Sequence, residues 1–341
     1  QYKPNEVFDL TYDLLYSDYK IQEDQNQAWY GGNNWGNWAG GNVGSYTDPV
    51  IVNGDLIGAT TAYSEITSVI ARYEEDKTLL VTGLNGRWRL EDWTIAADLS
   101  YSSAERSNLW RSIQMNYYPT SMTWLLTEDP SIRVSEQPDT AFYTPEFGEA
   151  TPGRLKDEMT SAAVDFTRSF GGDFWTTLQF GARYADRTKS EATGYSQYPA
   201  PLTGVTIDGS TLTAYNFKNF DIPVMLNGDF DSLLQTVYGA NAANIDPESI
   251  AYNSDVQEKV WETYVQGNFD TTFINAPVNG NIGVRVVNVD SQSAGESRSG
   301  GGWFQDIVTG DWIEFPLEVT VAEGGVTYTK VLPSASVKVE L

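Results

Sequence analysis

The chain of 341 residues contains no cysteine and no histidine. Without cysteine there is no disulfide framework, no thiolate nucleophile and no cysteine-ligated metal. Without histidine the chain lacks the commonest general base, the commonest zinc ligand and every catalytic triad that depends on a histidine.

Basic residues are also scarce, with 21 lysines and arginines against 46 acidic residues and a formal net charge of −25. Such a chain repels nucleic acid phosphates, so we expect no nucleic acid partner. Strongly acidic chains can be disordered. The 11 Trp, 20 Tyr and 14 Phe residues argue against disorder, because they are far too many for a solvated tail.

Long apolar runs are missing as well. No stretch of about 18 consecutive apolar residues occurs, which argues against a transmembrane helix. The first residues, Gln1–Asn5, lack the charged and apolar regions of a signal peptide. In a secreted protein this points to a mature chain or a fragment.

What the sequence does contain is a repeated alternation of apolar and polar residues. In 8–17, Phe8, Leu10 and Tyr12 fall on one face, whereas Asp9 and Thr11 fall on the other. This period of two is typical of a strand with one apolar and one polar face. It recurs in eight segments, for which we expect strands near 5–19, 78–90, 93–103, 158–170, 174–187, 259–271, 280–291 and 327–341.

The connections between these segments alternate between short and long. Short turns are expected at Glu91–Asp92, Gly171–Asp173 and Asn275–Gly280, and long segments at 21–77, 104–156, 188–258 and 292–326. Transmembrane barrels have short turns at one rim and long loops at the other. Aromatic residues such as Trp88 and Trp93 flank the short turns, as in the aromatic girdles of such barrels. The fold class we expect is therefore all-β, an antiparallel up-and-down transmembrane barrel. The alternative is a soluble sandwich with aromatic residues at its strand ends.

Eight strands can close a small barrel, but small barrels seldom carry four such long loops. The first expected strand begins close to residue 1 and the last includes Leu341. A sheet cut at those points would leave two unpaired edges in the bilayer, where unpaired backbone groups are very costly. We therefore expect an arc of about eight strands from a larger barrel.

Several strand segments resemble those of TonB-dependent outer-membrane receptors, of the type found in Caulobacter-like and Xanthomonas-like bacteria. The resemblance rests on Tyr12–Tyr19, Arg72–Thr78 with Gly83–Asn85 and Trp88, Glu262–Phe269 with Gly280–Arg285, and Tyr328–Ser334. It implies an outer-membrane barrel of about 22 strands that holds a plug domain and takes up a scarce nutrient with energy delivered by TonB. The implied partners are outer-membrane lipid, the plug, the remaining strands and, indirectly, the TonB system. The sequence shows no TonB box, no plug domain and no terminal strand that ends in an aromatic residue, so the resemblance covers a middle portion of the barrel.

The segment Trp29–Asn42 interleaves aromatic rings with glycine and asparagine in an expected extracellular loop. Flat rings stack on sugars and amides hydrogen-bond to hydroxyl groups, which suits a concave ligand site. The ligand-binding candidates are Trp29, Tyr30, Asn33, Asn34, Trp35, Asn37, Trp38 and, in the last long loop, Trp303. We expect an oligosaccharide, because acidic loops suit an anionic siderophore less well. The alternatives are a siderophore receptor of the same family, or a loop that packs on its own aromatic residues.

Residues 221–257 contain one helical pattern. Phe230, Leu233, Leu234 and Val237 have helical spacing, Asp229 or Asp231 lies near the N-cap, and Gly239 is placed to end the helix. We expect a small helix in the third long loop that covers the barrel mouth.

Charged residues on the polar strand faces are expected to line the lumen or contact the plug: Asp13, Arg87, Asp98, Arg183, Glu262 and Arg285. The paired acids in turns and loops, such as Glu91–Asp92, read as solvated charge. The chain is therefore not expected to be an enzyme or to hold a metal or cofactor. Two rival functions are a soluble carbohydrate-binding or carbohydrate-cleaving β-protein, and a surface adhesin.

Overall fold

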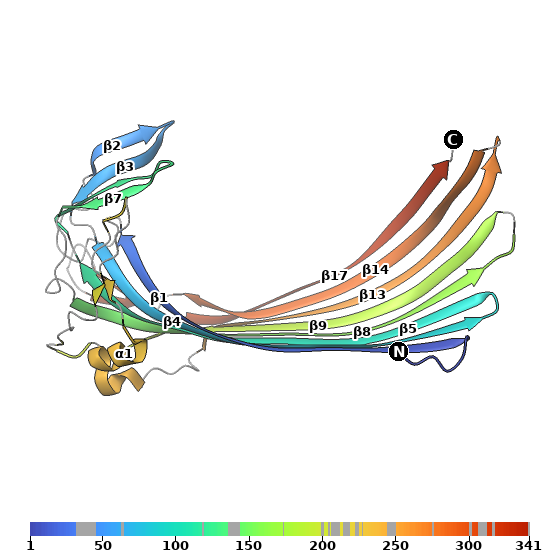
Figure 1. Cartoon of the computed structure of the whole chain (residues 1–341), viewed down its shortest axis with the longest axis horizontal. Coiled ribbons are helices and arrows are strands. Elements are labelled where there is room, and N and C mark those ends of the chain that lie inside the picture. The colour runs from blue at the N-terminus through green and yellow to red at the C-terminus, as the bar shows by residue number, and fades with distance from the viewer. Residues whose placement is uncertain are drawn as a thin grey trace.

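The protein is dominated by one antiparallel sheet of eight long strands, which bends into an arc (Figure 1). The computed structural model describes residues 1–31, 46–62, 65–117, 119–135, 144–172, 174–198, 201–203, 205, 212–213, 219–221, 225–226, 228–243, 250–274, 276–299, 302–305, 312–315 and 318–339. The eight strands are β1 (Phe8–Gly31), β4 (Glu65–Leu90), β5 (Trp93–Tyr117), β8 (Thr144–Ser169), β9 (Trp175–Gly194), β13 (Ile250–Phe273), β14 (Ala276–Ser299) and β17 (Glu318–Val339).

Each long strand pairs with its neighbours in sequence order, and every pair is antiparallel. The expected all-β class, the eight strands and the turn at Glu91–Asp92 are confirmed, and short connections also join Ser169 to Trp175 and Phe273 to Ala276. The turn expected at Asn275–Gly280 was too long, because β14 already begins at Ala276. Two of these turns use a left-handed residue, Glu91 at φ 48° and Ile274 at φ 47°. The sheet is open: within the described residues, β1 and β17 each pair with a strand on one side only.

The strands are much longer than the sequence predicts. β1 was expected to end near residue 19 but continues to Gly31, and β4 begins at Glu65 rather than near 78. The extension of β1 carries polar residues on both faces over most of Lys20–Gln27, so hydrophobic alternation does not reveal it. In the extension of β4, the consecutive apolar residues Val69, Ile70 and Ala71 break the alternation, although they are buried.

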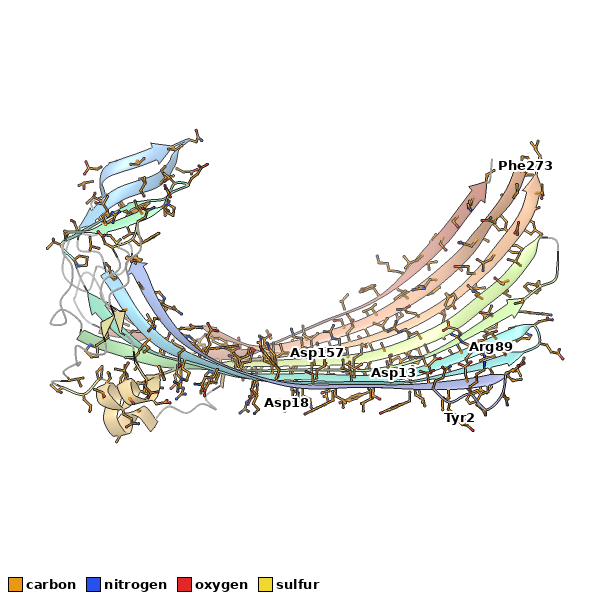
Figure 2. The ribbon with its side chains drawn as sticks, viewed as in Figure 1. Tyr2, Asp13, Asp18, Arg89, Asp157 and Phe273 are labelled. Carbon is orange, nitrogen blue, oxygen red and sulfur yellow. The ribbon has the colours of Figure 1, made fainter. Side chains whose placement is uncertain are left out.

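The register keeps the two faces of the sheet separate from strand to strand. Phe8, Trp88, Ile95, Phe166, Phe180, Val265 and Val284 are consecutive partners on one face. Thr11, Asn85, Asp98, Ala163, Arg183, Glu262 and Val287 are consecutive partners on the other face. Figure 2 shows Asp13 and Asp157, which belong to the second face, on the concave side of the arc, and Asp18, which belongs to the first, on the convex side. The apolar face is therefore convex and the polar face concave.

A second, smaller sheet lies near the long-loop end of the arc, on its concave side (Figure 1). It comprises β2 (Tyr46–Val52), β3 (Asp55–Ala62), β6 (Ser121–Leu125) and β7 (Ser131–Val134) in that order. No pattern in the expected loops predicted this smaller sheet. The remaining short strands are β10 (Ser196–Gln197), which pairs with β8, and the pairs β11 (Leu212–Thr213) with β12 (Met225–Leu226) and β15 (Gly302–Gln305) with β16 (Trp312–Phe315).

The expected helix is present as α1 (Phe230–Tyr238). The Asp229 carboxylate accepts a hydrogen bond from the backbone N–H of Ser232 at 2.9 Å, which caps the first turn. The Ser232 hydroxyl, at 2.7 Å, and this N–H together lower the pKa of Asp229. Gly239, at φ 56°, ends the helix, and a 3₁₀ turn (Gly239–Ala243) follows. In the part of the chain that the structure describes, no helix is long and apolar enough to cross a membrane.

Helix α1 packs on the convex face of the strand extensions rather than over the mouth of the arc (Figure 1). Its side chains join the main buried cluster, in which Phe230, Leu233, Leu234, Val237 and Tyr238 meet Ile66, Ile70, Ile113 and Met115. Two arginines flank the Phe230 ring, with the guanidinium carbon of Arg72 5.5 Å and that of Arg111 5.3 Å from its centroid. Arg72 also pairs with Asp231 at 2.5 Å and with Asp24 at 2.6 Å, so the helix is tied to both β4 and β1.

We predict that Phe230→Ala releases α1 from the sheet without unfolding the sheet. Truncating a fully buried phenylalanine costs about 3–5 kcal/mol, which exceeds what a nine-residue helix contributes alone. Hydrogen exchange should accelerate across α1 and leave residues 80–90 protected. The matched control is Gln235→Ala on the exposed side of the same helix. Equal protection of α1 in both variants would contradict the anchoring role.

Candidate functional site

The concave face carries a hollow of ≈ 360 Å³ in the middle of the sheet. Three acids, two arginines and a tyrosine line it from five strands: Asp98 of β5, Asp165 of β8, Arg183 of β9, Glu262 and Tyr264 of β13, and Arg285 of β14. Alternate residues of each strand face the hollow, so the period-two pattern alone accounts for these positions.

A hydrogen bond crosses one strand at the centre of this hollow. The Tyr264 hydroxyl donates to Oδ1 of Asp165 at 2.7 Å, although β9 lies between their two strands. The residue of β9 beneath them is Gly181. A Cβ there would lie 2.5 Å from Asp165 Oδ1 and 2.8 Å from Tyr264 Cε1. Glycine at 181 therefore makes room for the Tyr264 ring to lie flat across the sheet.

The arginines complete a network of alternating charge. Arg285 Nη1 lies 3.4 Å from Glu262 Oε2, and its guanidinium carbon lies 5.8 Å from the Tyr264 ring centroid. Asn85 Nδ2 reaches Asp98 Oδ2 at 3.5 Å. Arg183 lies beside Glu262 in the register. The surface can thus bind a partner that carries both charges, through hydrogen bonds held in place by neighbouring ion pairs.

All six expected lumen residues lie on the concave face. The hollow brings together Asp98, Arg183, Glu262 and Arg285. Asp13 and Arg87 lie on β1 and β4, away from it, and Arg87 is the register partner of Asp9. Asp9 is only 7 % exposed and forms an ion pair with Arg89 at 2.6 Å.

Tyr264 and Asp165 line the hollow but were not among the expected site residues. Tyr264 lies between Glu262 and Gln266, a spacing that places it on the polar face. That spacing was the available signal, but an uncharged ring does not stand out among charged neighbours.

The expected aromatic ligand site is only partly described. Trp29 lies at the end of β1 on the concave face, with its side chain 40 % exposed. Tyr30 points to the convex side, where it packs against the buried cluster, and burial raises its pKa to about 12. The two neighbours therefore do not share a surface. Asn33, Asn34, Trp35, Asn37 and Trp38 lie outside the described residues, and of Trp303 only the backbone, in β15, is described.

A second polar array covers the concave face of the strand extensions. The Glu75 side chain is buried, accepts a hydrogen bond from the Tyr73 hydroxyl at 2.6 Å and pairs with Lys77 at 2.6 Å. The bonds from Lys77 and Tyr73 lower the pKa of Glu75. This carboxylate is therefore ionised and locally neutralised at neutral pH.

Comparison of the chain with protein-family profiles, with curated proteins and with solved structures finds no match.

We predict that Tyr264 and Asp165 are energetically coupled. A hydrogen bond to a charged group contributes about 1.5–3 kcal/mol, so Tyr264→Phe and Asp165→Ala should each lower the free energy of unfolding, measured in urea in detergent micelles. The double variant should lose about 1 kcal/mol less than the sum of the two single losses. Tyr12→Phe, which removes an exposed hydroxyl on the convex face, serves as the control. Strictly additive losses would show that the hydrogen bond contributes nothing.

Proposed function

We propose that the chain forms an arc of the wall of an outer-membrane β-barrel receptor, in which the convex face meets lipid and the concave face lines the lumen. The observation that carries this proposal is an exposed apolar band on the convex face. It includes Tyr12 (59 % exposed), Leu99 (58 %), Trp261 (57 %), Ile282 (55 %) and Val337 (65 %). A water-soluble protein rarely exposes so large a continuous apolar surface.

The band crosses the strands obliquely. On β1 it centres on Tyr12, within Phe8–Tyr16, and on β17 it centres on Ala335, within Val331–Val339. The register, however, leads from Tyr12 through six intervening strands to Thr329. The centre of the band on β17, Ala335, therefore lies six residues from Thr329, on the side of the short turns. This shift accumulates over the seven strand-to-strand steps from β1 to β17.

A shift of this size has a simple geometric meaning. About one residue per strand, at ~3.3 Å per residue and ~4.8 Å between strands, corresponds to a strand tilt of about 30–35°. Transmembrane barrels tilt their strands by ~35–45°. A level slab of lipid against tilted strands requires this drift, whereas a dry core between two sheets does not.

Aromatic residues mark both limits of the band. Trp88, Trp93, Trp175 and Phe269 lie near the short turns, and Tyr16, Tyr101 and Tyr184 lie at the opposite limit. The Tyr101 hydroxyl bonds to Glu158 at 2.8 Å and that of Tyr184 to Asp186 at 3.2 Å, so both hydroxyls reach polar groups beside the band. Rings with one apolar and one polar end favour the lipid–water interface.

The height of the band also matches the apolar band of outer-membrane barrels. On β5 it runs from Trp93 to Tyr101, about 26 Å along the strand at ~3.3 Å per residue. After a tilt of about 30° this is about 23 Å, close to the ~25 Å apolar band of outer-membrane barrels.

The concave face supports a receptor rather than a purely structural wall. Its charged network at Asp98, Arg183, Glu262 and Arg285 suits a lumen that contains water or a plug domain. Within the described residues, β1 and β17 each have one edge without a partner strand, and in a bilayer such an edge would require a further strand. Together with the strand motifs that resemble TonB-dependent receptors, these features support energy-dependent nutrient uptake as the function, with the plug, further strands and the TonB system as partners.

The membrane position of the band is tested by two neighbouring residues of β5. Leu99 faces outward in the band and Ser100 faces the lumen. Arginine on the lipid face near the midplane costs about 2–4 kcal/mol. We expect Leu99→Arg to lower the free energy of unfolding in liposomes by this amount. Ser100→Arg should cost less, about 0.5–1.5 kcal/mol for the hydrogen bond between its hydroxyl and that of Ser161 at 2.7 Å. Equal costs, or a chain that stays monomeric and folded without lipid or detergent, would overturn the membrane assignment.

The uptake function is tested in cells that express the gene. We expect accumulation of a labelled nutrient, either a neutral oligosaccharide or a ferric hydroxamate, that a protonophore abolishes because TonB draws on the proton gradient. The control is a strain in which the gene is deleted. Accumulation of neither compound, or accumulation that the protonophore leaves unchanged, would contradict active uptake and favour an adhesin-like role.

A further inference from the structure

Two tryptophans on the concave face are joined through two glutamines. Trp29 Nε1 donates to Gln27 Oε1 at 2.7 Å, and Gln27 Nε2 donates to Gln25 Oε1 at 2.7 Å. Trp110 Nε1 donates to the same Gln25 oxygen at 3.4 Å. Each indole N–H is thus satisfied by an amide, which fixes the orientation of both rings without covering them.

The Trp110 ring has to lie along the sheet surface to make this bond. Trp110 belongs to β5 and Gln25 to β1, with β4 between them. The register partner of Gln25 on β4 is Ala71. Alanine leaves room above the strand for the indole to cross it, as Gly181 does for Tyr264. A ring that lies along the wall offers a broad apolar face to the space inside the arc.

The surroundings of the two rings are polar and largely neutralised. On β5 itself the buried Gln114 Nε2 donates to Ser112 Oγ at 3.2 Å and to Glu149 Oε1 of β8 at 3.3 Å. The buried Glu75, beside Tyr73, is paired with Lys77. Because these buried groups are paired with one another, the wall beside the rings favours a neutral ligand over one that carries formal charge.

We propose that Trp29 and Trp110, held by Gln25 and Gln27, form a stacking platform for a neutral saccharide on the inner wall of the strand extensions. The inference rests on the proposed function, because it takes the concave face to line the entry path. It adds the substrate class and a site on rigid strands rather than on the loop that follows Tyr30. The platform lies at the end of the arc where the smaller sheet rises on the concave side (Figure 1), so a ligand there would be approached from the mouth.

The test is calorimetric titration of the whole chain in detergent micelles with three neutral probes, cellohexaose, xylohexaose and maltohexaose. We expect at least one to bind. Trp110→Ala should weaken its affinity about five- to tenfold, the loss expected for one aromatic contact. Gln25→Ala should weaken it to a similar extent although glutamine 25 does not stack, because both rings lose their fixed orientation. Trp110→Phe keeps a ring and should retain part of the affinity.

The matched control is Trp261→Ala, which removes an exposed indole from the convex face and should leave affinity unchanged. Three results would overturn the platform: no hexasaccharide binds the folded wild-type chain, binding survives both Trp110→Ala and Gln25→Ala, or a ferric hydroxamate binds through these same residues instead. The Leu99→Arg and Ser100→Arg pair reports on membrane placement independently. If no saccharide binds but Leu99→Arg lowers the free energy of unfolding as expected, the platform is rejected and the proposal of a barrel wall is retained.

Discussion

One continuous hydrogen-bond register runs through the eight long strands, and the other features of the molecule depend on it. Side chains alternate between faces, so a slip of one residue at any pair would invert every strand beyond it. The slip would place Arg183 and Glu262 among the apolar side chains of the convex face. The pairing of β9 with β13 has a register shift between Asn268 and Phe269, close to the short-turn end of both strands. This shift brings Trp175 opposite Phe269. The separation of the two faces is thus a property of the pairing as much as of the composition.

The sequence allowed the part of the fold near the short turns to be predicted, because one face there is apolar and the other polar. The helix and both of its ends were also predictable, because Asp229, Phe230 and Gly239 determine its start and end through neighbouring residues of the chain. The strand extensions were not predictable, because Lys20–Gln27 is polar on both faces. The position of α1 on β4 was likewise hidden. It depends on contacts such as Arg72 with Asp231, 159 positions apart, which no local pattern encodes.

The candidate sites, like the fold, could be predicted from the sequence only in part. Alternation was enough to place Asp98, Arg183, Glu262 and Arg285 on one face, but not to show which of them meet in a hollow. Trp29 and Tyr30 looked equivalent in a loop, yet a strand that continues to Gly31 sends them to opposite faces. Trp110 was overlooked because its strand was expected to end near 103. Extending the strands thus changes the functional reading, since residues assigned to loops become parts of a rigid wall.

The drift of the apolar band constrains any strand that joins this sheet. The band shifts toward the short turns by about one residue per strand. If such a sheet closes into a barrel, the band meets its own beginning only when the total stagger of the strands, in residues, is about equal to the number of strands. This stagger is the shear, which is linked to strand tilt and barrel diameter. A strand paired with β1 must carry its apolar run slightly nearer the long-loop end, and one paired with β17 slightly nearer the short turns. Under the proposed membrane placement, the extensions lie beyond the lipid and are free of this constraint. Their inner face can therefore hold rings and amides such as Trp110 and Gln25, while their outer face is covered by α1.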